Sequence, residues 1–178
     1  ALREAVVKRL AAKQLRFSAL ALMATHTHSG FGGYWDNAIA ERTSMGKFDE
    51  KIFEFLAMRI SEAISRANAT KIPARIGHGS IHLPGSVRNR RDAANPTDPV
   101  LSVIRIDDLQ GNPKARIVNF AAHATVLGAK NLALSADFPG ALAAALEKRL
   151  AVALFTVAAA GDIRPMSVAG STRFEKAR

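Results

Sequence analysis

The chain has 178 residues, of which 48% are hydrophobic and 22% charged, so its composition excludes a disordered or collagen-like protein. Cysteine is absent, which excludes disulfide frameworks, thiolate metal sites and thiol nucleophiles. The 25 basic and 15 acidic residues give a net charge of +10, which attracts anionic partners in general. For this length we expect one compact domain over residues 1–178.

The first half of the chain mixes helical patterns with irregular stretches. Apolar residues recur at helical spacing over 1–14, which predicts a helix. The apolar run at 17–25 has the length of a buried strand, and a glycine-rich turn follows at 30–33. A second amphipathic helix is predicted over 48–68. Residues 70–99 contain four prolines and predict a long extended loop or a set of short strands.

The second half is more regular. Strands are predicted at 100–107 and 115–122, joined by a turn at 108–113 into a hairpin. A helix is predicted at 137–150 and a buried strand at 152–160. Helices that alternate with nearly all-apolar strands indicate an α/β fold, and the hairpin makes its sheet mixed, flanked by helices.

Histidines stand where two of these strands end. His26 and His28 follow the run at 17–25, and the period of two in a strand places their side chains on one side, with Thr27 on the other. Such a pair can hold a metal or handle a proton, or it can be an ordinary hydrogen-bonded pair. His123 follows the strand at 115–122, where it is either a core residue or a third imidazole in the same crevice. Three imidazoles suit zinc.

Other polar residues allow two interpretations each. Asp137 can begin a helix and Asp162 can shape a turn. Alternatively, either carboxylate can orient a metal-binding imidazole. Arg90 can bind a carboxylate or a polarised carbonyl, or it can be part of a solvated surface. His78 and His82 are expected to be surface histidines in a loop, because a glycine between them and a proline after them argue against a helix.

Five blocks in the same order resemble the neutral/alkaline non-lysosomal ceramidases. They are ATHTHSGFGGY at 24–34, NR at 89–90, NFAAHAT at 119–125, SAD at 135–137, and GD at 161–162 with Pro165. The HTHSG block is rather specific, and the ordered set is much more so. The resemblance spans residues 16–165.

The resemblance implies a zinc amidohydrolase that cleaves the N-acyl bond of ceramide. By the pattern of the family, His26 and His123 are zinc ligands, and His28 handles a proton or orients the substrate. Arg90 lines the same pocket. A metal-activated water would attack the acyl carbonyl of an N-acyl lipid or a related small substrate.

The family completes its zinc site with a glutamate and a tyrosine far downstream, which we expect beyond residue 178. The chain is therefore expected to be a fragment of a larger ceramidase-like catalytic domain, incomplete at both ends. Arg164 stands where characterised ceramidases have a serine, and Phe31 where they have a proline. The chain resembles bacterial members of the family more closely than the characterised ceramidases. The resemblance implies a role in sphingolipid and lipid metabolism. The location is unknown from the sequence, and the resemblance alone implies a secreted or periplasmic one.

A second hypothesis uses the charge of the chain. A basic module that has lost catalysis would bind anionic lipid, or another macromolecule, at a membrane surface. Nucleic acid is not an expected partner, because aromatic residues are 6% of the chain and none lies within its one tight arginine cluster, Arg88, Arg90 and Arg91. No apolar run reaches the roughly 18–20 residues of a membrane span, and the charged first fifteen residues do not form a signal-peptide core.

Overall fold

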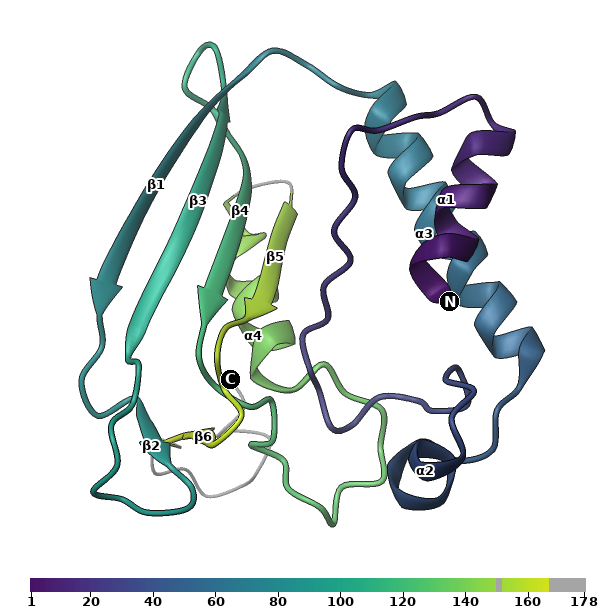
Figure 1. The fold of residues 1–178 in the computed structure, drawn as a ribbon. Coiled ribbons are helices and arrows are strands. Elements are labelled where there is room, and N and C mark those ends of the chain that lie inside the picture. Colours follow the sequence, from purple (N-terminus) through teal and green to yellow (C-terminus); the bar gives the residue numbers. More distant parts are fainter. Residues whose placement is uncertain (150–151, 167–178) are drawn as a thin grey trace. The chain divides into compact units, whose positions relative to one another are not determined.

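A computed structural model describes residues 1–149 and 152–166, and the chain forms two compact units (Figure 1). The first unit contains Ala1–Leu22 and Phe31–Ile72. The second contains Met23–Gly30 and the chain from Pro73 onward. Each unit is described by itself, and one domain over residues 1–178 stays a prediction. Within the described residues, no helix is both long and apolar enough to cross a bilayer.

Two packed helices form the first unit. Helices α1 (Leu2–Ala12) and α3 (Glu50–Ala69) confirm the two helices predicted in the first half of the chain. Their shared core contains Val6, Leu10 and Ala57, which are all almost fully buried. The small Ala57 side chain lets the two helices approach closely, so this pair of helices depends on local periodicity and on one small residue at the contact.

The glycine-rich turn supports a helical segment that the sequence did not predict. A short helix α2 (Ala38–Ala40) continues into a π-helical turn η1 (Glu41–Met45). A Cβ atom on Gly32 would lie 1.9 Å from the carbonyl oxygen of Met45, so only glycine fits at this position. The backbone N–H of Gly33, whose φ is +81°, donates to that same oxygen at 2.7 Å. The glycines therefore serve close backbone packing.

A mixed four-stranded sheet forms the second unit. Its order is β1 (Ala74–His82), β3 (Val100–Asp108), β4 (Pro113–Phe120) and β5 (Val152–Val157). The β1–β3 and β3–β4 pairs are antiparallel, and β4–β5 is parallel. Helix α4 (Asp137–Leu146) connects β4 to β5 and packs on β5. These elements confirm the predicted hairpin and the α/β fold with a mixed sheet and helices; in this unit one helix, α4, packs on the sheet.

The two faces of this sheet differ. Val103, Val118 and Phe155 share one face by register and pack in the core, where Phe155 meets Phe138 of α4 edge to face at 5.2 Å. On the other face, Leu154 pairs with Ile117 in the register, and the Leu154 side chain is 53% exposed. Helix α4 therefore covers one face of the sheet, as an amphipathic helix on a sheet requires.

The structure decides two predictions about the irregular stretches: the strand predicted at 17–25 is wrong, and residues 70–99 form strands. No strand forms at 17–25, where Leu20 packs against the core of the first unit and the chain from Met23 onward belongs to the second. The run is thus divided between two units, and no neighbouring strand pairs along it within the described residues. Residues 70–99 contain the nine-residue β1 and the short β2 (Val87–Asn89), so the interpretation as strands is the right one, although β1 is long.

The turn between β3 and β4 depends on one carboxylate. Asp108 accepts hydrogen bonds from the backbone N–H groups of Gln110 at 3.0 Å and Asn112 at 2.8 Å, and from the Asn112 side-chain amide at 2.9 Å. It also forms an ion pair with Lys114 at 3.2 Å. Against the opposing effect of burial, the Asn112 side chain and these other contacts lower the pKa of Asp108 to about 2.

This lowered pKa predicts a specific acid sensitivity. A group whose pKa is lower in the folded state stabilises the fold above its unfolded pKa of about 3.9, and this stability is lost as the pH falls toward 2. We expect Asp108→Asn to lose less stability between pH 5 and pH 2.5 than the wild type, measured by urea unfolding. The exposed Asp36→Asn variant is the control. If Asp108→Asn lost as much stability over this pH range as the wild type, the lowered pKa of Asp108 would not be the cause of the acid sensitivity.

Candidate metal centre

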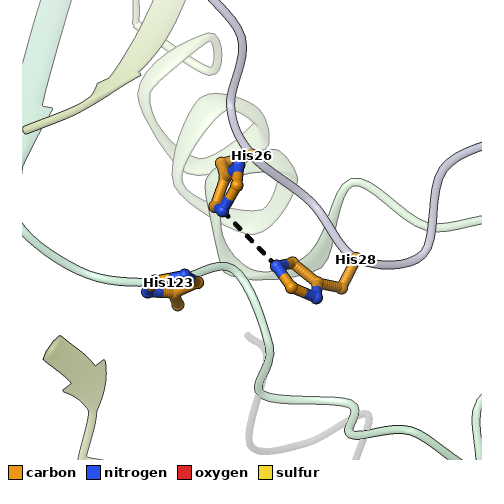
Figure 2. A group of neighbouring side chains, drawn as sticks. All are labelled: His26, His28 and His123. Atoms are coloured by element: carbon orange, nitrogen blue, oxygen red, sulfur yellow. Dashed lines mark hydrogen bonds between the residues drawn. The ribbon is translucent and has the colours of Figure 1, made fainter. Parts of the chain in front are cut away.

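Three histidines from two distant segments of the second unit lie together (Figure 2). One ring nitrogen from each of His26, His28 and His123 lies within 4.8 Å of the others. The ring centroids are 4.8 Å apart for His26 and His123, 5.0 Å for His26 and His28, and 5.5 Å for His28 and His123. His123 is buried and the other two are exposed, so the cluster has one solvent-accessible side.

Backbone contacts bring the two segments together. Thr27 forms an isolated parallel bridge with Ala124, and the backbone N–H of His28 donates to the Ala124 carbonyl at 3.2 Å. The Thr27 hydroxyl donates to the Ser135 carbonyl at 2.8 Å. Thr27 is therefore bound to the neighbouring loop, while the two flanking rings reach His123.

The predicted same-side placement of His26 and His28 occurs without the predicted strand. His26 has a φ of +58°, in the left-handed region that costs a residue other than glycine about 1–2 kcal/mol. Its Nε2 atom lies 3.5 Å from Nε2 of His28. Strained backbone of this kind concentrates at functional sites, and here the strained residue carries a ring of the cluster.

The tautomer of His123 follows from its partner. The Nδ1 atom lies 2.9 Å from the carbonyl oxygen of Ile163, at the start of β6 (Ile163–Pro165). A carbonyl oxygen only accepts hydrogen bonds, so Nδ1 carries the hydrogen and donates it. Nε2 of His123 is therefore left with its lone pair, which is the form that binds a metal.

The donor set fits a zinc ion. Zinc takes imidazole nitrogens at about 2.0–2.1 Å, so two nitrogens on one tetrahedral ion lie about 3.3 Å apart. Ring nitrogens of His26 and His123 lie within 4.8 Å of each other, so a shared ion requires a small adjustment of the rings, and Nε2 of His28, 3.5 Å from Nε2 of His26, lies beside that position. Uncharged nitrogen donors with one open side are typical of catalytic zinc sites.

The surroundings keep the exposed rings uncharged. Partial burial, followed by the repulsion that His123 exerts when its ring is protonated, lowers the pKa of both His26 and His28. Arg90 lowers both pKa values further, whereas the negative charge of Asp137 acts in the opposite direction on His28. At pH 7 both rings are therefore neutral, as metal binding requires.

Asp137 begins α4, as predicted, and holds the segment that follows His123. Its buried carboxylate accepts hydrogen bonds from the backbone N–H groups of Val126 at 3.3 Å, Leu127 at 3.1 Å and Phe138 at 2.7 Å. The predicted bond from Asp137 or Asp162 to an imidazole is not found among the described hydrogen bonds. For His123 the Ile163 carbonyl takes that place.

Arg90 and Asp162 lie beside the cluster in one small network. The Arg90 guanidinium donates to the Gly161 carbonyl at 2.5 Å, and its backbone N–H donates to the Asp162 carbonyl at 2.7 Å. The Asp162 carboxylate accepts from the side-chain amide of Asn89 at 2.7 Å. Arg90 is exposed and acts electrostatically on His26 and His28, so its charge lies close enough to influence both rings.

Sequence reasoning did not assign a role to two of these groups. Asn89 belongs to the NR block at 89–90, but its side chain contacts Asp162, 73 residues later in the chain, which the sequence alone does not reveal. Ile163 contributes a backbone carbonyl, which no side-chain identity reveals. His78 and His82 lie on the edge strand β1 instead of in a loop; both are exposed, as expected, and neither belongs to the cluster.

The family model described as "Neutral/alkaline non-lysosomal ceramidase, N-terminal" matches residues 1–172. Curated relatives include neutral ceramidase A of Dictyostelium discoideum, 35% identical over 67% of this chain and 18% of the relative. Neutral ceramidase B of the same organism is 32% identical over 81% of this chain and 23% of the relative. Neutral ceramidase of Pseudomonas aeruginosa is 35% identical over 67% of this chain and 19% of the relative.

Solved structures agree with this match. The neutral ceramidase from Pseudomonas aeruginosa superposes with a TM-score of 0.85 and 29% identity, over 100% of this chain and 32% of that one. A ceramidase complexed with C2 gives the same TM-score at 28% identity, over 100% of this chain and 31% of that one. This chain spans about a fifth of the length of the curated relatives. It belongs to the neutral/alkaline non-lysosomal ceramidase family.

Proposed function

We propose that this chain provides part of the active site of a zinc-dependent hydrolase that cleaves N-acyl amide bonds of the ceramide type. The observation that carries the proposal is the convergence of His26, His28 and His123 from two separate segments. The names of the relatives, which are neutral ceramidases, support the reaction class.

The three histidines divide into two roles in this proposal. His26 and His123 would hold the zinc ion, the latter through the Nε2 atom that its bond to Ile163 leaves with a lone pair. The ion would supply Lewis acidity, which acidifies water and polarises the acyl carbonyl. His28, which is exposed and neutral, would take the proton from the attacking water and transfer it to the amine.

Hydrolysis adds water across the amide bond. The water oxygen bonds to the acyl carbon, the C–N bond breaks, and a proton ends on the amine, so the products are a carboxylic acid and an amine. The positive charge of Arg90, which acts on both exposed rings, would be suited to the negative charge that develops on the acyl oxygen. An N-acyl lipid is the substrate we propose, and an ester of similar shape would follow the same chemistry.

Zinc content and amide hydrolysis test this proposal together. We expect the intact protein to retain zinc by elemental analysis and to hydrolyse a fluorogenic N-acyl-sphingosine. A chelator should abolish the hydrolysis and added zinc should restore it. His26→Ala should lose both properties, whereas His82→Ala, on the exposed edge strand, should keep them. Absence of zinc together with unchanged behaviour of His26→Ala would overturn the proposal.

One observation favours the second hypothesis, a basic binding module. On the two-stranded sheet of β2 and β6, Arg88 and Arg164 stand directly opposite each other, and both are exposed. Like charges in this position repel unless an anion lies between them. In the test above, a protein without zinc that binds acidic vesicles in a salt-sensitive way would support this alternative.

A further inference from the structure

We propose that Asn89 is a positioning residue that fixes the tautomer of His123 and the place of Arg90 through the turn at 161–163. Its relevance to hydrolysis rests on the proposed function, because His123 is there a zinc ligand. The positioning itself is a property of the chain and can be measured without zinc.

The Asn89 side chain is a buried amide whose nitrogen and oxygen atoms both form hydrogen bonds. It is 3% exposed, and its Nδ2 group donates to the Asp162 carboxylate at 2.7 Å. Its Oδ1 atom accepts from the backbone N–H groups of Arg91 at 3.0 Å and Asp92 at 3.3 Å. A buried amide costs free energy unless its polar atoms are paired, so these contacts define one geometry.

The same turn supplies partners to two groups of the site. Asn89 pairs with Ile163 in the register of β2 and β6, and the Ile163 carbonyl accepts the hydrogen of Nδ1 of His123 at 2.9 Å. Arg90 donates to the Gly161 and Asp162 carbonyls at 2.5 and 2.7 Å. One buried side chain thus links the end of β2, which Arg90 follows, to the turn that orients His123.

Loss of the amide should release this turn. Without the bond from Asn89, the Asp162 carboxylate loses the described partner that holds it against β2. The backbone pairing of β2 and β6 still keeps the Ile163 carbonyl near the ring, but its direction is less restricted, and the hydrogen of His123 can reside on either nitrogen. The population with a free lone pair on Nε2 falls, and groups that orient a metal ligand in this way change metal affinity about 10–100-fold.

The test measures the tautomer of His123 directly. In long-range ¹H–¹⁵N spectra of the metal-free protein near pH 8, where imidazoles are uncharged, the wild type should show hydrogen on Nδ1 alone. Asn89→Ala should show a mixture of the two tautomers. The matched control Asn95→Ala, an exposed asparagine close in sequence, should match the wild type.

An exchange variant separates positioning from a general loss of structure. Asn89→Asp alone places two carboxylates together and should disturb the tautomer. Asn89→Asp combined with Asp162→Asn restores one amide and one carboxylate, and the oxygen at position 89 still accepts from the backbone N–H groups of 91 and 92. The combined variant should recover the wild-type spectrum.

Two outcomes overturn the proposal. One is a folded Asn89→Ala protein with hydrogen still on Nδ1 alone; if that variant does not fold, the same result in the milder Asp162→Ala variant is decisive. The other is an exchange variant that is folded but not recovered. Zinc affinity, expected to fall about 10–100-fold in Asn89→Ala, is measured separately. If the wild type binds no zinc but the tautomers change as expected, the proposed function fails and the positioning role stands.

Discussion

Replacement of His123 by alanine is expected to lower the zinc affinity of the protein at least about 100-fold, because even the loss of a group that only orients a ligand costs about 10–100-fold. His123 is the buried member of the cluster, and the Ile163 carbonyl holds its ring with Nε2 free. The ring is therefore already oriented for the metal before binding. Competition with a chromophoric chelator measures the affinity.

His78→Ala is the matched control for this experiment. His78 is an exposed histidine on β1, opposite Ile104, and lies outside the cluster. Its replacement removes the same chemical group and should leave zinc affinity unchanged. Equal losses in the two variants would show that zinc binds histidines non-specifically, and no loss in either would exclude His123 as a ligand.

The second large effect concerns stability. Phe155→Ala is expected to lower the free energy of unfolding by about 3–5 kcal/mol, because it leaves a cavity in the core between the sheet and α4. The side chain is 7% exposed and packs edge to face on Phe138. Domains are stable by about 5–15 kcal/mol in total, so the change is large. The midpoint of urea unfolding measures it.

The neighbouring residue provides the control. Leu154 lies on the same strand but points to the other face of the sheet, where it is 53% exposed. Leu154→Ala should cost less than about 1 kcal/mol, as for surface positions. If it costs as much as Phe155→Ala, that face of the sheet is buried in solution, and the assignment of inner and outer faces is wrong.

The site and the sheet are connected by topology. His123 follows the carboxyl end of β4, and the turn at 161–162 follows that of β5, its parallel neighbour. In α/β sheets, polar groups collect at these ends because parallel strands finish at the same edge. The third segment joins them through the Thr27–Ala124 bridge. A mutation in the β4–β5 core therefore disturbs the fold and the site together.

Local patterns in the sequence determined much of this protein. Apolar periodicity predicts α1 and α3, and the two strands with a turn between them predict the β3–β4 hairpin, since these patterns reflect which side of one element is buried. The histidines at 26, 28 and 123, each at the end of a predicted strand, likewise predict metal binding or proton transfer. These features depend on the residue type and its immediate neighbours.

Only the tertiary structure decided the rest. The run at 17–25 has strand composition but no strand beside it, because a strand exists only where another segment supplies its hydrogen bonds. The orientation of His123 comes from the carbonyl of Ile163, which the register of β2 and β6 pairs with Asn89, 74 residues earlier in the chain. Every residue has a backbone carbonyl, so its identity carries no signal, and only the folded chain determines which carbonyl reaches the ring.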